Sequence, residues 1–320
     1  MELIFKTVVG VLLLLFFTQC TRKKAAEPNL QNWLDGHFPG RFQVLSTQTD
    51  DAIRNLSFKV KKSVVVEAAD TMVQSLVRWD LRQPDLKLTT EGVIAQFERA
   101  AGEWEDAQSF LKTLKKNGFE NISISVRNGR AVVLDFEEPT PERRHKRILQ
   151  LEKALAEWPV SSNYDKELAF MDTTASDKDF GDFVPLAYWE QADVPYQKQK
   201  VISVFCPYND TFSAAEMAQT WVFNTGSDRF HVFYKKVREE LEKWTERHFK
   251  NELEPVFEMI EVRQSGEAPL LLIFKIPFVD KSAESNGSDD SHLGYFIIEF
   301  DVDRQEVEAI RQLDETPEEE

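Results

Sequence analysis

The sequence predicts an α+β fold with two domains, each a mainly antiparallel sheet covered by amphipathic helices. Two observations support this prediction. Apolar residues recur every three or four positions in long segments, and shorter segments between them alternate apolar and polar residues. The 320 residues are 42% hydrophobic and 12% aromatic, which is enough for two cores. We place the domains at residues 37–160 and 200–313, joined by a connection at 161–199.

The N-terminal domain is expected to begin with β structure. Strand-like patterns occupy three segments, residues 41–46, 56–60 and 64–68. A long amphipathic helix then runs from Glu91 to Lys116 and ends at Asn117-Gly118. Residues 121–126 and 131–136 follow on either side of Asn128-Gly129, a pair that adopts the positive φ angles of a type I′ turn, so we predict a β-hairpin.

A second helix is predicted directly after this hairpin. Thr140 can cap its first turn, and Pro141 suits the first helical position. Its apolar stripe comprises Ile148, Leu151, Leu155 and Trp158. Pro159 ends the helix, because proline cannot continue the backbone hydrogen bonding.

The connection at 161–199 has weak periodicity and a concentration of aromatic residues. We interpret Phe183, Tyr188 and Trp189 as the residues that bind a partner, because irregular segments bury their side chains less completely than strands. The alternative, which we favour on general grounds, is that this patch packs over the seam between the domains.

The C-terminal domain is expected to begin with a central strand at Val201 to Cys206. A capping-box pattern at Ser213 to Glu216 marks a helix start, and a longer helix follows from about Ser227 to Lys250. Three further strands are predicted at residues 256–262, 270–278 and 295–302. Asp303 is then expected to cap a short helix that carries Val307, Ile310 and Leu313, before an acidic tail at 314–320.

The first residues have the pattern of an export signal. A charged start at Met1 to Lys6 is followed by an apolar run at Thr7 to Phe17 and then by Cys20, a run too short to span a bilayer comfortably. This leader resembles that of bacterial lipoproteins, in which the signal peptide is cleaved before a cysteine that then carries diacylglycerol. The resemblance implies a signal peptide at 1–19, a lipid on Cys20 and a tether at 20–36.

The leader departs from the usual lipobox, because Phe17, Thr18 and Gln19 replace the preferred leucine and small residues. An uncleaved anchor from Leu3 to Thr18 is the alternative. The basic residues Arg22 to Lys24 after the apolar run argue against export of such an anchor. We therefore expect a membrane-anchored lipoprotein that faces the periplasm or the cell surface.

Charge and cysteine content exclude several classes of function. The net charge of −16 argues against binding nucleic acid. If Cys20 carries a lipid, Cys206 has no partner for an internal disulfide, and its apolar neighbours indicate a buried thiol. We expect no cofactor, because the chain contains none of the common phosphate, dinucleotide, hydrolase or metalloprotease motifs.

The remaining candidates for chemistry are weak. His248 is a candidate polar site because it continues the apolar stripe of the 227–250 helix, but no second histidine lies at metal-ligand spacing. Paired acids such as Glu137-Glu138 point to opposite faces and are expected to be solvated. The Asp- and Ser-rich loop at 280–292 departs from the EF-hand spacing, so we predict no calcium site.

We therefore hypothesise a non-enzymatic, lipid-anchored envelope protein that binds another protein. A periplasm-facing hydrolase, with acids or a histidine assembled only by the fold, is the first alternative. A module that binds a small ligand in the cleft between the domains is the second.

Overall fold

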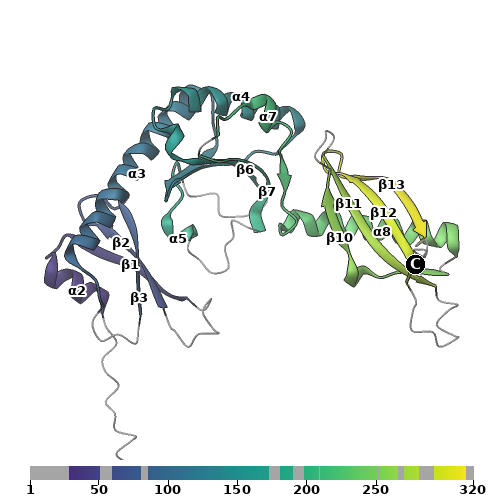
Figure 1. Cartoon of the computed structure of the whole chain (residues 1–320), viewed down its shortest axis with the longest axis horizontal. Coiled ribbons are helices and arrows are strands. Elements are labelled where there is room, and N and C mark those ends of the chain that lie inside the picture. Colours follow the sequence, from purple (N-terminus) through teal and green to yellow (C-terminus); the bar gives the residue numbers. More distant parts are fainter. Residues whose placement is uncertain are drawn as a thin grey trace, which may run out of the picture. The chain divides into compact units, whose positions relative to one another are not determined.

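The computed structural model describes residues 29–50, 60–80, 86–172, 181–189, 198–208, 210–250, 252–265, 270–280 and 292–314. Within them the chain mixes helices with sheets whose strands pair mainly in antiparallel fashion (Figure 1). It forms two compact units, Met1–Gly102 and Glu103–Glu320. The boundary lies inside one helix, α3 (Thr90–Lys116), whereas the sequence analysis expected domains at 37–160 and 200–313.

Several predictions concern residues outside the described ranges. They are the signal peptide at 1–19, the lipidated Cys20, the tether before Asn29, the interior of the 280–292 loop and the acidic tail beyond Asp314. These predictions stay predictions.

The first unit contains a three-stranded antiparallel meander. Its order is β1-β2-β3, with bounds Phe42–Asp50, Val60–Glu67 and Gln74–Asp80. The short helix α2 (Leu30–His37) precedes it, and the Asn29 side chain caps that helix by accepting the N–H of Asn32. Inside the sheet the buried Ser63 hydroxyl lies 2.8 Å from that of Thr47 and accepts from Trp79 Nε1, so this polar group is satisfied.

The second unit begins with a five-stranded sheet of order β4-β5-β6-β7-β8. The strands are Ile122–Arg127, Arg130–Asp135, Asp165–Met171, Lys200–Cys206 and Val222–Phe223. The predicted β4–β5 hairpin is confirmed, with Asn128 and Gly129 at φ 49° and 75° in its turn. The predicted internal strand is also confirmed, because β7 lies between β6 and β8.

The structure differs from the expected connection at 161–199, because β6 lies within that range. This strand pairs with β5 in parallel and with β7 in antiparallel orientation, so it occupies the centre of the sheet. Its residues are buried on both faces, including Lys166 and Glu167. Three charged residues, Asp165, Lys166 and Glu167, interrupt the continuous apolar pattern by which a central strand is recognised.

Helices begin where the sequence analysis predicted, although not every cap forms. Thr140 accepts the N–H of Arg143 at the start of α4 (Pro141–Glu157), and Ser227 accepts that of Phe230 at the start of α8 (Asp228–Phe249). Ser213 makes no capping bond with its side chain before α7 (Ala214–Met217). The carboxylate of Glu152 on α4 accepts the Ala214 N–H instead.

The C-terminal sheet has the order β10-β11-β12-β13, and β9 pairs with the end of β11. Its strands β9 to β13 are Leu253–Pro255, Glu261–Gln264, Leu271–Asp280, His292–Asp301 and Glu306–Asp314. The strand expected at 256–262 is interrupted by a turn of 3₁₀ helix, η3 (Phe257–Met259). Phe233 and Trp244 of α8 pack against Phe300 and Phe296 of β12, with ring centroids 4.9 and 5.8 Å apart.

The helix predicted after Asp303 is wrong, because these residues form the edge strand β13. Val307 pairs with Phe300 and Ile310 with Ile298, and a β-bulge lies between these two pairs. The extra residue places two side chains three positions apart on the same face of the sheet. This spacing imitates the period of a helix, which explains the wrong prediction.

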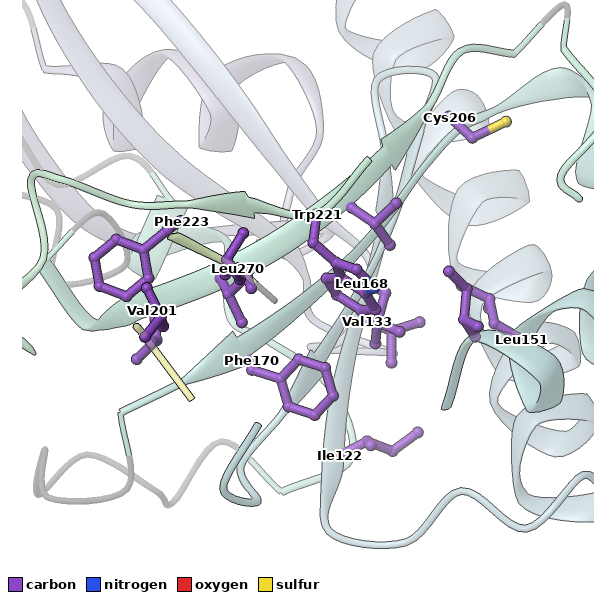
Figure 2. Packing of buried hydrophobic residues seen from close by; sticks show 14 of the residues in the cluster. Ile122, Val133, Leu151, Leu168, Phe170, Val201, Cys206, Trp221, Phe223 and Leu270 are labelled. Atoms are coloured by element: carbon purple, nitrogen blue, oxygen red, sulfur yellow. The ribbon is translucent and has the colours of Figure 1, made fainter. Parts of the chain in front are cut away.

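One apolar core joins the two sheets of the second unit. Figure 2 shows Leu151 of α4 beside Val133 and Leu168, and Leu270 beside Val201 and Phe223. Leu270 immediately precedes β11, so the core of the first sheet continues into that of the second. Gln264 reinforces this junction, because its side chain accepts the Phe223 N–H at 2.7 Å and donates to the carbonyl of Trp221.

A buried ion pair fixes α4 against the β4–β5 end of the sheet. Arg147 Nε donates to Asp135 Oδ2 at 2.6 Å, and both side chains are almost fully buried. Its two terminal nitrogens donate to the carbonyls of Gly118 and Glu120 and to the side chains of Gln150 and Glu137. The five donors of the guanidinium are thus all used. Burial raises the pKa of Asp135 to about 6, and the charge of Arg147 offsets part of that rise.

Replacing Arg147 with Gln should destabilise the protein by about 3–5 kcal/mol, because Asp135 would lose its buried counter-charge and the carbonyl of Glu120 would lose its donor. Urea unfolding measures the change in free energy. Arg263→Gln is the matched control, since Arg263 is 80% exposed and lies 3.6 Å from Glu261. Equal stability of the two variants would contradict a structural role for the Arg147 network.

The pH dependence of stability should carry a contribution from Asp135. Its folded pKa of about 6 lies above the unfolded value near 4, so the folded state binds the proton more tightly between these pH values. The free energy of unfolding should therefore fall as pH rises through this window. Measuring the free energy of unfolding of wild type and of Asp135→Asn at about pH 4 and pH 7 isolates the contribution of Asp135. If the free energy changes equally with pH in both proteins, Asp135 makes no such contribution.

Candidate functional site

The aromatic segment predicted to bind a partner lies against the sheet. The Ile124 N–H donates to the carbonyl of Asp182, and the Val184 N–H donates to the carbonyl of Ile124, at 3.0 and 2.9 Å. This pairing forms a parallel bridge between Phe183 and the edge strand β4. The segment therefore continues into α5 (Leu186–Trp189) from a position fixed by backbone hydrogen bonds.

The three predicted partner-binding residues differ in their environments. Tyr188 is only 6% exposed and packs in a cluster with Val132, Leu134, Ala169, Met171 and Val184, while its hydroxyl donates to Gln199 at 3.1 Å. Phe183 is half-buried against Trp104, at a centroid distance of 4.4 Å, and Trp189 is half-buried beside Tyr188. The structure therefore places this patch in a packed layer on the sheet.

His248 lies at the end of α8, at the edge of the apolar stripe, and is exposed. Its ring stacks on Trp244 at 4.4 Å, and Nδ1 lies 2.8 Å from the Trp244 carbonyl oxygen. A histidine in the last turn interacts favourably with the helix dipole when it is protonated. Among the described residues no cluster of three or more His, Cys, Asp or Glu side chains could hold a metal ion.

Cys206 and Lys166 form a buried pair of groups below a surface loop. Burial raises the pKa of the Cys206 thiol, which keeps it protonated and unreactive. The buried ammonium of Lys166 donates to the carbonyls of Pro207, Tyr208 and Asp210. Lys166 therefore fixes the loop after β7, at whose tip Tyr208 is 60% exposed.

A second surface combines charge with exposed apolar side chains. The open surface, as we call it, consists of Arg130, Glu167, Lys200, Phe205 and Val222. These residues come from four adjacent strands, β5 to β8, and lie on the sheet face that also carries the Tyr188 cluster.

Glu167 occupies the centre of the open surface. Its carboxylate is 5% exposed and contacts Arg130 Nη2 at 2.8 Å and Lys200 Nζ at 3.2 Å. Phe205 lies directly opposite Glu167 in the β6–β7 pair and is 47% exposed. Val222 lies opposite Ser203, two residues before Phe205, and is 60% exposed.

The sequence analysis missed the open surface because it interpreted the β7 segment as buried on both faces. Phe205 is part of that apolar run, and nothing in the run distinguishes an exposed phenylalanine from its buried neighbours. The only available signal was the spacing, since Ser203 and Phe205 share a face in a strand. Partners for Glu167 could not be inferred, because they come from β5 and β7.

A cleft of about 540 Å³ lies at the edge of β4. Phe119 and Phe136 are among the residues that line it, together with Lys115 and Asp182, which form an ion pair at 2.7 Å. The volume falls in the range of small-ligand sites, and the lining is mixed in polarity.

Comparisons with protein-family models, with curated proteins and with solved structures found no match to this chain. In the part of the chain that the structure describes, the helices lack the combination of length and apolar character needed to span a membrane.

Replacing Tyr188 with Ala should destabilise the protein by about 2–4 kcal/mol, because it leaves a cavity against the sheet. The matched control is Tyr208→Ala, which removes an exposed ring and should change stability by less than about 0.5 kcal/mol. Urea unfolding of both variants measures the difference. Unchanged stability of Tyr188→Ala would show that the ring is not packed against the sheet and would again make Tyr188 a candidate for binding a partner.

Proposed function

We propose that this chain is a lipid-anchored, non-enzymatic protein of the cell envelope and that it binds another protein through the open surface. The observation that supports this function is the exposure of Phe205 and Val222 on adjacent strands, next to a charged group. Protein interfaces typically place large apolar side chains at the centre and polar groups at the rim. The loop that Lys166 holds presents Tyr208 beyond the same strand, β7.

The anchoring part of the proposal rests on the leader. The short apolar run that ends at Cys20 favours lipidation there, with the mature chain facing the periplasm or the cell surface. We further propose that amphipathic helices cover the sheets of both units. The packing of α8 on the C-terminal sheet supports this arrangement.

Binding of a small ligand is a second candidate function, and the cleft beside β4 favours it. A bound ligand would raise the melting temperature, because it stabilises only the folded state. For the hydrolase alternative the described residues show only that Nδ1 of His37 and Nδ1 of His248 each lie 2.8 Å from a backbone carbonyl oxygen of the same helix.

Crosslinking and pull-down from native envelopes test the proposed function. A Phe205→Ser/Val222→Ser variant should lose the partners that wild type retains. Val232→Ser is the matched control, because Val232 is 54% exposed on α8, outside the open surface. Cys20→Ala should release the protein from the membrane while the purified variant still binds.

Two outcomes would contradict the proposal separately. If the open-surface variant remains folded and retains every partner, the binding site lies elsewhere. If Cys20→Ala remains membrane-bound, the protein has no lipid anchor at this position.

A further inference from the structure

Three Asn-Gly pairs occur in the chain, and the structure describes two of them. Asparagine is most prone to deamidation when glycine follows it, because glycine has no side chain to shield its backbone nitrogen from the neighbouring amide. Asn128-Gly129 forms the turn of the β4–β5 hairpin, and Asn117-Gly118 directly follows α3. Asn286-Gly287 lies outside the described residues. The surroundings of the first two pairs differ in a way that predicts different reactivity.

The Asn117-Gly118 pair is held by hydrogen bonds at both of its reacting groups. The side-chain nitrogen of Asn117 donates to the carbonyl of Thr113 at 3.0 Å and to Glu157 Oε2 at 3.4 Å. The Gly118 N–H donates to the carbonyl of Lys115 at 3.1 Å. Neither group can rotate toward the other until the end of α3 opens.

The Asn128-Gly129 pair lacks these restraints. Both residues are exposed, and within the described part of the chain no hydrogen bond engages the Asn128 side chain, the Asn128 carbonyl or the Gly129 N–H. Contacts on either side hold the turn in place, since the Asn128 N–H donates to Glu103 Oε1 and the Gly129 carbonyl accepts from the Asp165 N–H, each at 2.7 Å. The peptide unit that joins Asn128 to Gly129 is therefore the unbonded part of an anchored turn.

The backbone of this turn also suits the reaction. Asn128 has φ 49°, and hairpin turns of types I′ and II′ share a positive φ at the first of their two central residues. The two types differ in the orientation of the peptide unit between the central residues, and glycine at the second position tolerates either orientation. Rotation of this unit moves the Gly129 nitrogen past the Asn128 side chain.

We propose that Asn128 is a site of spontaneous deamidation in the folded protein. The Gly129 nitrogen forms a bond to Cγ of Asn128, and its proton leaves with the side-chain nitrogen as ammonia. Water then opens the cyclic imide at either of its two carbonyls, which gives aspartate or isoaspartate in place of Asn128. This inference is independent of the proposed function.

The product would change the contact between the hairpin and α3. It places a carboxylate on the residue whose N–H Glu103 accepts, and two anions at this separation repel each other. The isoaspartate form also lengthens the backbone by one carbon within a two-residue turn. Deamidation would therefore weaken the link between Glu103 and the turn.

Incubation of the purified protein at mildly alkaline pH, in water enriched in heavy oxygen, tests the proposal. Peptide mapping by mass spectrometry then measures conversion at each Asn-Gly pair, because each deamidation incorporates one labelled oxygen. Asn128 should convert roughly tenfold faster than Asn117, because hydrogen bonds at both reacting groups must open before Asn117 can react. Isoaspartate should accompany aspartate at residue 128, since hydrolysis of the imide yields both.

Two controls separate the effect of the fold from that of the sequence. Urea removes the restraints at both pairs, so Asn117 and Asn128 should then react at similar rates. Gly129→Ala, whose added Cβ meets no atom within 4 Å, should slow conversion of Asn128 by shielding the attacking nitrogen and should leave Asn117 unchanged. The urea comparison uses wild type alone, so it decides even if Gly129→Ala unfolds.

Equal conversion of the two pairs in the folded protein would overturn the proposal, as would aspartate without isoaspartate at residue 128. The proposal would also fail if Asn128 reacts in urea and not in the folded protein. In that case the hairpin would restrain this peptide unit as firmly as the end of α3 restrains the Asn117-Gly118 pair.

Discussion

The buried guanidinium of Arg147 is the constraint on which the first sheet of the second unit depends. The turn between α3 and β4 has backbone carbonyls at Gly118 and Glu120 that neither the helix nor the sheet can satisfy. Arg147 reaches them from α4 and binds Asp135 at the end of β5 at the same time. The Arg147 side chain thus links the end of α3, the start of β4 and the end of β5.

Buried charge also explains what could be predicted from the sequence. The β4–β5 hairpin, α3, α4 and α8 follow from turn chemistry and from apolar periodicity, because their residues satisfy local rules. The strand β6 could not be predicted in this way, because its buried residues Lys166 and Glu167 are satisfied by groups distant in sequence. Tertiary contacts supply their partners, and no local pattern contains that information.

The candidate binding residues also could not be identified from local sequence patterns. Tyr188 and Trp189 were selected because they are aromatic residues in a segment of weak periodicity. In the structure this segment pairs with the edge strand β4, and Tyr188 packs against the face of the sheet. Phe205 was overlooked because it belongs to a regular strand. Aromatic composition therefore indicated neither burial nor exposure here: the packing of α5 on the sheet buries Tyr188, and its position in β7 exposes Phe205.

The same register gives the open surface its particular chemistry. Strand pairing places Phe205 opposite Glu167, and the covering segment at 181–189 contacts the other end of this sheet face, around Val132 and Met171. The burial of Glu167 then requires cations nearby, because an isolated carboxylate would be costly. Arg130 and Lys200 meet that requirement by direct contact with its carboxylate. Phe205 and Val222 therefore lie exposed beside a charged group that the sheet needs to satisfy its own buried acid, and this combination of apolar and polar side chains is typical of protein interfaces.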